Sequence, residues 1–268
     1  MIEPFRNVFK SSSHNLIMKS KPKFVPIILI SVIVIVIISG LIVYFNNEER
    51  FLKGKIINRE KIQSDTEILT ISYQGTESKV LKLNTPKKTF LVSFDDNTRP
   101  SLDWIKENTP PESKFLSWWD HGGLIKSYTQ RRVVVASPSK NILSFVASFG
   151  NVGEWNEKVS DPLTSDKTIK DVALALSNKE NTREIMKQYG ADYILIKKSD
   201  KNLIGVISSI AEEKEYNTPQ YNLCFVDEKA CIGLLEESFI KLAIEQVNVE
   251  DFELVYTDES VVIYRLRN

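Results

Sequence analysis

An uncharged apolar run near the N-terminus restricts the possible folds of this chain more than any other feature. It extends from Phe24 to Phe45, covers 22 residues and is rich in Ile and Val. At a rise of about 1.5 Å per residue, a helix of this length spans roughly 33 Å, which is enough to cross the hydrocarbon core of a bilayer. Pro26 would lie in the first turn, where proline is tolerated. The run therefore predicts a single transmembrane helix over residues 24–45.

A cleaved signal peptide is the alternative interpretation of this run, but the apolar region of a signal peptide usually has only about 7–15 residues before a small-residue cleavage site.

The residues that flank the run indicate its orientation in the membrane. Lys and Arg are equally numerous near the two ends of the run, yet three lysines lie immediately before it, and Glu48 and Glu49 are the first charges after it. These nearest charges favour a cytoplasmic leader over residues 1–23. The globular part is then expected on the extracytoplasmic side of the cell membrane.

Composition limits the function of the part that follows. The chain has 35 basic and 35 acidic residues, so its formal net charge is zero and no nucleic-acid partner is expected. It contains two histidines, His14 and His121, and no Walker A, G-x-G-x-x-G or G-x-S-x-G motif. We therefore predict no metal site, no cofactor and no catalytic residue. Asp95 and Asp96 are interpreted as turn formers, and Lys197 as solvated surface.

Strand and helix patterns divide the remaining residues into two parts. Strand-like segments at residues 67–74, 78–83 and 89–94 predict a small juxtamembrane β segment over residues 46–98. From residue 99 onward, strands are expected at 115–118, 132–136 and 193–196, and helices at 101–107, 123–129, 141–149, 169–177, 181–189 and 203–211. This alternation predicts an α/β domain over residues 99–268 with a largely parallel sheet. Strands at 252–257 and 260–266 should close it as an antiparallel hairpin.

The pentapeptide from Trp118 to Gly122 is the strongest candidate for a binding site. A hydroxyl group offers one donor and two acceptor sites, and the two indole N–H groups and the carboxylate of Trp118, Trp119 and Asp120 match it in number and polarity. The segment lies where a predicted strand gives way to a helix, which is where open α/β sheets bind ligands. Successive strand residues point to opposite faces, so the chain must turn there, and Gly122 with Gly123 makes a turn possible.

Structural interpretations of these residues remain open. Trp118 or Trp119 could be a core aromatic, and Asp120 could cap the following helix.

Cys224 and Cys231 flank six residues, a spacing that a hairpin could bridge by a disulfide outside the cytoplasm. Two free thiols are the alternative, because spacing does not fix the Cα separation that a disulfide needs.

Several segments resemble the catalytic subunit of oligosaccharyltransferase, the enzyme of protein N-glycosylation. The family has a Trp-Trp-Asp-Tyr-Gly signature after a W-I-x-x-N-T-P helix, and this chain has Trp118 to Gly122 after Leu102 to Pro111. The stretch from Tyr189 to Ile196 is similar to the family's Y-G-x-D-Y-V-L-V strand, and the last two strands resemble its closing pair. The resemblance spans residues 99–268. His121 stands where the family has Tyr.

The resemblance implies a role in reading acceptor sequences. In the family, this soluble domain recognises the sequon Asn-X-Ser/Thr, and a multi-pass membrane region, which this chain is expected to lack, carries the metal and the catalytic groups. The implied substrate-binding residues are Trp118, Trp119, Asp120, His121, Gly122 and Ile207. Ile207 follows from a family Asp-x-x-Lys pattern that is only half present, since Asp200 is retained but Leu203 replaces Lys. A plain core position is the alternative for Ile207.

Three functions are compatible with these features. The first is a membrane-anchored, non-catalytic relative of the oligosaccharyltransferase reader domain that recruits acceptor polypeptide or assists a separate full-length oligosaccharyltransferase. The second is an extracytoplasmic interaction or structural module that kept the fold and lost the ligand. The third is a stand-alone glycosyltransferase, which is disfavoured because no metal site or pair of catalytic carboxylates is evident.

Overall fold

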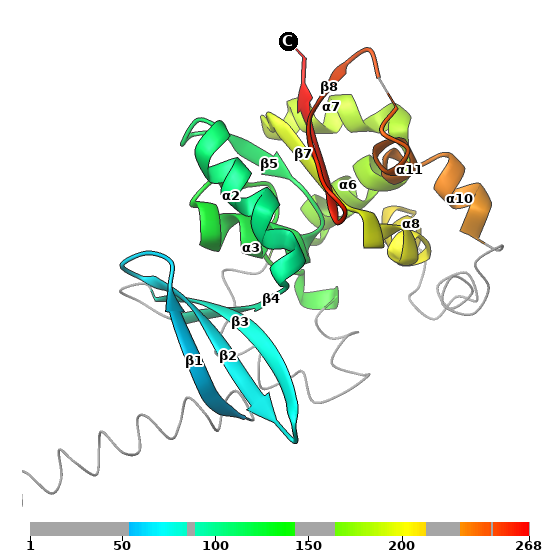
Figure 1. The fold of residues 1–268 in the computed structure, drawn as a ribbon. Coiled ribbons are helices and arrows are strands. Elements are labelled where there is room, and N and C mark those ends of the chain that lie inside the picture. The colour runs from blue at the N-terminus through cyan, green and yellow to red at the C-terminus, as the bar shows by residue number, and fades with distance from the viewer. Residues whose placement is uncertain (1–53, 85–88, 143–163, 213–230, 248, 268) are drawn as a thin grey trace, which may run out of the picture. The chain divides into compact units, whose positions relative to one another are not determined.

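The computed structural model describes residues 54–84, 89–142, 164–212, 231–247 and 249–267 (Figure 1). The chain divides into two units, residues 1–53 and 54–268, and all described ranges fall in the second. Within these ranges, no helix has the length and apolar character needed to cross a membrane. The predicted leader over residues 1–23 and the predicted transmembrane helix over residues 24–45 lie outside them, as does most of the predicted helix at 141–149.

The first sheet is a four-stranded antiparallel meander. Its strands are β1 (Lys55–Lys61), β2 (Thr66–Tyr73), β3 (Thr76–Asn84) and β4 (Thr89–Phe94), hydrogen-bonded in that order. Gln74 and Gly75 join β2 to β3 with φ angles of 50° and 82°, as in the hairpin turns that match the strand twist. One face of this sheet contributes Ile68, Leu81 and Phe94 to an apolar cluster with the helices that follow.

The second sheet has the strand order β6-β5-β7-β9-β8. Its strands are β5 (Lys114–Leu116), β6 (Arg132–Val133), β7 (Tyr193–Lys197), β8 (Phe252–Thr257) and β9 (Val261–Leu266). Strand β5 pairs in parallel with β6 and β7, whereas β9 pairs antiparallel with both β7 and β8. The prediction of a largely parallel sheet is therefore wrong, and the sheet is mixed. The C-terminal hairpin joins the sheet directly at β7, which makes two of the four pairings antiparallel.

Helices cover both faces of the second sheet. Alternate residues of β7 point to opposite faces, so Tyr193 and Leu195 join one apolar cluster while Ile194 and Ile196 join the other. On the first face lie α2 (Arg99–Asn108) and α3 (Trp119–Thr129), which also contact the first sheet. On the second face lie α6 (Asp166–Ser177), α7 (Lys179–Tyr189), α8 (Ile204–Ala211) and α11 (Phe239–Ile244). Short helices complete the described part: η1 (Asp96–Thr98), η2 (Lys198–Leu203) and α10 (Ile232–Glu236).

Strand β6 is shorter than the sequence pattern indicates. A strand was expected over residues 132–136, but only Arg132 and Val133 pair with β5. The chain then leaves the sheet, and Val135 packs into the cluster on the second face with 2% of its surface exposed. A run of valines fits either arrangement, because it is apolar in every direction.

The end of α7 provides a first testable prediction. Gly190 follows α7 with φ 59° and ψ 42°, a left-handed conformation, and an added Cβ would meet nothing within 4 Å. The cost of Gly190→Ala is therefore conformational only, about 1 kcal/mol of unfolding free energy. Gly190→Asn should cost less, because Asn tolerates this conformation. Denaturant unfolding of the two variants checks this order, and an alanine variant as stable as the parent would contradict it.

Candidate functional site

The pentapeptide lies at the edge of the second sheet where two parallel strands end. Strand β5 ends at Leu116, and α3 begins at Trp119 with Trp118 as its N-cap residue. The neighbouring strand β7 ends at Lys197 and leads into η2. Because parallel strands end at the same edge, the starts of α3 and η2 are brought together. His121 Nε2 and Asp200 Oδ1 accordingly lie 2.8 Å apart.

The two tryptophans occupy one apolar cluster with different exposure. Trp118 is 1% exposed and lies among core residues, whereas Trp119 is only partly buried and packs against the same cluster. Their ring centroids are 4.0 Å apart, with the planes tilted by 33°. Of the two indole rings, only that of Trp119 is thus partly open to a ligand, and Trp118 supports it from the core.

The turn at the pentapeptide differs from the predicted one. Trp118 has φ −60° and ψ 148°, and its carbonyl already accepts from the backbone N–H groups of His121 and Gly122. The chain therefore turns at Trp118, and Gly122 and Gly123 lie inside α3. Glycine is needed at 122 for a different reason, since a Cβ there would lie 1.9 Å from the carbonyl oxygen of Val135. The pentapeptide glycine permits close helix packing rather than an unusual backbone angle.

Asp120 lies in the first turn of α3 and is exposed to solvent. It does not cap the helix, because the N-cap position is Trp118 and no side chain caps there. Desolvation by the surrounding protein raises the pKa of the Asp120 carboxyl, while His121 and a hydrogen bond from the Trp119 side chain oppose this rise. The positive end of the helix also favours a carboxylate at this position.

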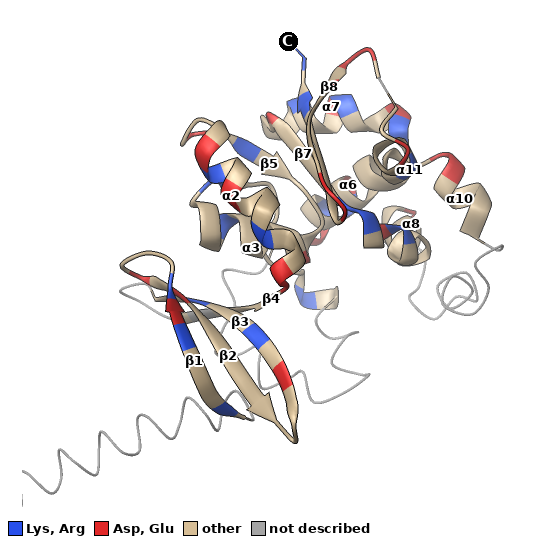
Figure 2. Cartoon of the chain, in the orientation of Figure 1, with Lys and Arg blue, Asp and Glu red and all other residues tan. Residues whose placement is uncertain are grey.

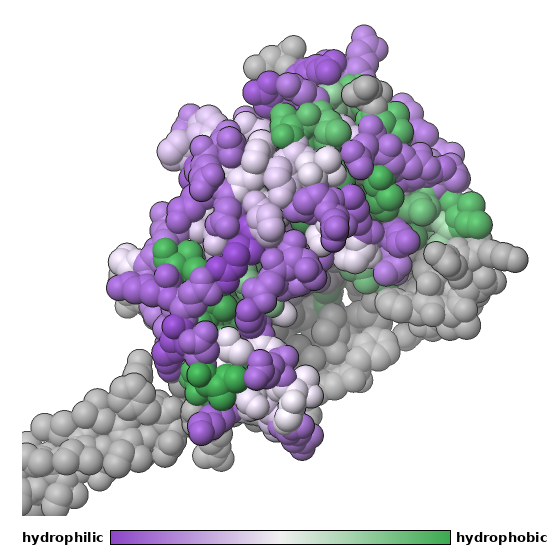
Figure 3. Space-filling view, in the orientation of Figure 1, coloured by the Kyte–Doolittle hydropathy of each residue, from purple (hydrophilic) through white to green (hydrophobic). Residues whose placement is uncertain are grey.

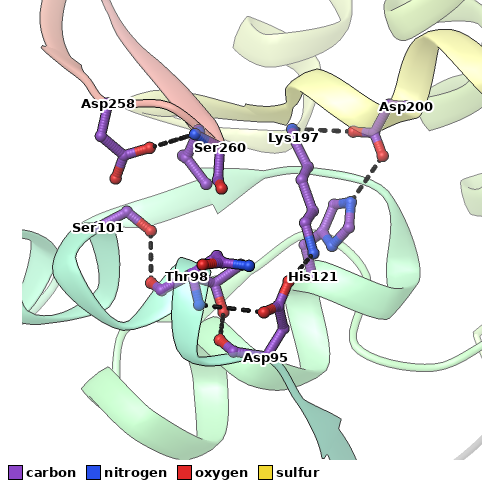
Figure 4. A network of polar contacts seen from close by, with 10 residues as sticks. Asp95, Thr98, Ser101, His121, Lys197, Asp200, Asp258 and Ser260 are labelled. Carbon is purple, nitrogen blue, oxygen red and sulfur yellow. Dashed lines mark hydrogen bonds and ion pairs between the residues drawn. The ribbon is translucent and has the colours of Figure 1, made fainter.

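A chain of polar contacts runs from the buried Asp200 and the partly buried His121 to the partly exposed Lys197 and Asp95, as Figure 4 shows. Asp200 accepts at Oδ2 from the backbone N–H of Lys197 at 3.0 Å, in addition to its contact with His121. Lys197 Nζ donates to Asp95 Oδ2 at 2.8 Å, and Asp95 Oδ1 accepts from the backbone N–H of Asn97. The hydrogen bond from Lys197 lowers the pKa of Asp95. This network ties α3, η2, β7 and the turn after β4 together.

The space beside this network is too small for a ligand. A cavity of about 10 Å³ is lined by Thr98, Ser101, His121, Lys197 and apolar side chains. Such a volume accommodates about one water molecule. Among the described residues, no three His, Cys, Asp or Glu side chains are arranged to hold a metal ion. Within the described residues, Asp120 is exposed and Trp119 is partly buried, so these two side chains of the pentapeptide can reach a ligand at the surface.

Comparisons with known proteins follow from the whole sequence and structure. No family model matches the chain. It is 27% identical over 106 residues to the stt3 subunit of dolichyl-diphosphooligosaccharide–protein glycosyltransferase from Schizosaccharomyces pombe, and 40% identical over 50 residues to the STT3B subunit from Oryza sativa subsp. japonica. The chain is related to oligosaccharyltransferase subunits. The resemblance deduced from the pentapeptide and its flanks is thereby confirmed.

The oligosaccharyltransferase-related part is a small fraction of these relatives. The two alignments cover 39% and 19% of this chain, but only 11% and 7% of the relatives. Two structures of the C-terminal globular domain of oligosaccharyltransferase from Archaeoglobus fulgidus align with TM-scores of 0.45 and 0.41 and identities of 18% and 17%. These alignments cover 66% and 65% of this chain and 100% and 97% of those domains.

The remaining predicted residues of this oligosaccharyltransferase-related chain are not brought to the site surface. Ile207 lies in α8 with 0% exposure, in the same core cluster as Trp118. Cys231 is disulfide-bonded, and Cys224, its predicted partner, lies outside the described residues.

Sequence reasoning did not assign Asp95 and Lys197 to the site. Asp95 does form a turn, since its side chain caps η1, but it also pairs with Lys197 across 102 positions of the chain. Neither residue type carries a local signal for such a pair. The half-present Asp-x-x-Lys pattern did point to Asp200.

Proposed function

We propose that residues 54–268 form a non-catalytic, oligosaccharyltransferase-related domain that recognises the Ser or Thr of an Asn-X-Ser/Thr acceptor in protein N-glycosylation. The observation that carries this proposal is the exposed residue Asp120 beside the partly exposed Trp119, at the sheet edge where β5 and β7 end. The relationship to oligosaccharyltransferase subunits supports it. Acceptor polypeptide is the proposed ligand, and a separate full-length oligosaccharyltransferase the proposed partner. The extracytoplasmic position of this domain stays a prediction.

The chemistry of this pair suits an alcohol. A carboxylate only accepts hydrogen bonds and has about four lone-pair positions, so one bond from Trp119 leaves room for a hydroxyl donor. An acceptor with Val in place of Thr would cover the carboxylate without offering a donor. That loss of hydration without a replacement bond is the basis for discrimination.

Replacing Asp120 tests the proposal directly. The full chain should bind an Asn-X-Thr peptide roughly tenfold more tightly than an Asn-X-Val peptide, a difference of about 1.4 kcal/mol. Asp120→Asn should abolish this preference, because an amide offers one oxygen and no charge. Glu180→Gln is the matched control, since Glu180 is another exposed acid in the first turn of a helix. Fluorescence anisotropy of labelled peptides measures both variants. Equal binding of the two peptides by the parent chain would refute the proposal.

An interaction module is the second candidate, and a specific observation favours it. The large apolar side chains of Ile57, Tyr73, Ile232 and Val247 are exposed. Figure 3 shows apolar patches on an otherwise hydrophilic face, and Figure 2 shows charges of both signs distributed over the described helices and strands. A folded Asp120→Asn variant with unchanged peptide binding would favour this module. Sugar transfer from a lipid-linked donor by the purified chain alone would instead require a catalytic role.

A further inference from the structure

The contact between His121 and Asp200 joins the segment that carries Asp120 to η2. The two atoms are 2.8 Å apart, and the side chains are only 13% and 2% exposed. An ionised carboxylate cannot donate, so the shared hydrogen must lie on His121 Nε2. The second proton of the imidazolium, on Nδ1, therefore decides whether this contact is an ion pair or a hydrogen bond from a neutral ring.

Charges on three elements surround the imidazole. Asp200 on η2 and Asp120 on α3 favour the charged ring, and Lys197 on β7 disfavours it. Lys197 is itself paired with Asp95 at 2.8 Å, which reduces its effect on His121. Burial lowers the pKa of His121, but the charge and hydrogen bond of Asp200 and the charge of Asp120 together outweigh it, so the pKa lies above its ordinary value of 6.5.

We propose that His121 is a proton-controlled positioning residue, which in its charged form holds the first turn of α3, and with it Asp120, against Asp200 on η2. The inference deepens the proposed function and rests on it for its effect on acceptor binding. Loss of the Nδ1 proton leaves a hydrogen bond from a neutral ring to the Asp200 carboxylate and removes the attraction between the two opposite charges. The position of Asp120 then becomes less restricted, and the favourable field of the imidazolium on its carboxylate disappears.

The direction of the pH dependence follows from the raised pKa. A group with a raised pKa in the folded state adds stability that is fully present below its unfolded pKa, here about 6.5. This stability is lost as the pH rises through the folded pKa. Each unit of difference between the two corresponds to a tenfold change in the unfolding equilibrium, or 1.36 kcal/mol. Both stability and acceptor binding should therefore decrease on the alkaline side of pH 6.5.

Nuclear magnetic resonance of the histidine rings tests, without any peptide, whether Asp200 keeps His121 charged above pH 6.5. The full chain has only two histidines, so the signal that disappears in His121→Gln is that of His121. It should titrate above pH 6.5, and Asp200→Asn should lower its midpoint by about one unit or more. Asp120→Asn should lower the midpoint less, because Asp120 makes no hydrogen bond to the ring among the described contacts. Circular dichroism shows whether each variant is folded.

The pH profile of peptide binding tests the effect of this charge on acceptor binding. Affinity for the Asn-X-Thr peptide should fall severalfold as the pH passes the measured midpoint of His121, and His121→Gln should bind with a flat profile. A midpoint at or below 6.5 in the parent chain would overturn the inference even if Asp200→Asn failed to fold. The inference would also be overturned if the parent chain needed Asp120 for peptide binding but bound the peptide with the same affinity at every pH. If no peptide binds at all, the proposed function fails. The titration of the His121 ring and the pH dependence of unfolding then show separately whether the charged ring stabilises the contact with Asp200.

Discussion

Among replacements of the described glycines by alanine, Gly122→Ala is expected to lower the free energy of unfolding most. The new Cβ would lie 1.9 Å from the carbonyl oxygen of Val135 and 3.0 Å from its carbonyl carbon, and both are backbone atoms. No side-chain rotation can relieve this overlap, so α3 would have to move away from residues 134–136. Overpacking of this kind usually costs about 1–3 kcal/mol, and a backbone obstacle should put the loss at about 3 kcal/mol or more.

Gly233→Ala is the matched control for this prediction. Gly233 lies inside α10, and a Cβ there would meet nothing within 4 Å. Alanine should stabilise this helix by about 0.5–1 kcal/mol, because it loses less backbone freedom on folding than glycine. Denaturant midpoints of the two variants should therefore shift in opposite directions. A Gly122→Ala variant within about 1 kcal/mol of the parent would show that α3 can move to accommodate the methyl group.

The same variant bears on the site. Because α3 carries Asp120 and His121, a forced shift of the helix should also disturb the 2.8 Å contact of His121 with Asp200. Packing at Gly122 and the geometry of the site are therefore coupled through α3. In the proposed function, Trp119 and Asp120 contact the ligand, whereas Trp118 and Gly122 fix the helix that presents them.

The sequence pattern predicted those strands and helices in which the polarity of the side chains agrees with their burial in the structure. The continuous apolar stretch from Tyr193 to Ile196 predicted β7, and the structure covers both faces of that strand. Strand β1 has the sequence KIINREK and was not predicted, since most of it is exposed. Charged residues are typical of edge strands, where they hinder pairing with other chains. Among the described strands, β1 pairs with β2, and this pairing defines it as a strand.

Long-range pairings account for the remaining differences. Strand patterns do not show which strand lies next to β7, so the insertion of β9 there and the mixed sheet were not predicted. The sheet edge that carries the site could be predicted, because it follows from strand direction alone. The contact between His121 and Asp200 could not, because 79 positions separate them. Which tryptophan is buried also depends on a turn located at Trp118 rather than at the glycines.

Arg131→Met is expected to cause the second largest loss of stability, because the Arg131 side chain caps the C-terminal ends of α2 and α3 by hydrogen bonds to their carbonyl groups. Its guanidinium donates to the carbonyl oxygens of Lys106 and Thr109 at 2.9 and 2.7 Å, to Thr109 Oγ1 at 3.1 Å, and to the carbonyl oxygen of Thr129 at 3.1 Å. Only 9% of the residue is exposed, so water cannot readily replace these donors. Leaving several carbonyl groups of α2 and α3 unpaired should cost about 3 kcal/mol of unfolding free energy.

The neighbouring residue provides the control for the Arg131 prediction. Arg132 is exposed and donates from Nε to the carbonyl oxygen of Glu112 at 2.8 Å, so Arg132→Met should change stability by no more than about 0.5 kcal/mol. Arg131→Lys should recover only part of the loss, because an ammonium group cannot reproduce the planar arrangement of guanidinium donors. Urea unfolding of the three variants measures this order. Equal midpoints for Arg131→Met and Arg132→Met would mean that the helix ends find other donors, and the two helices that lie between the sheets would then not depend on this side chain.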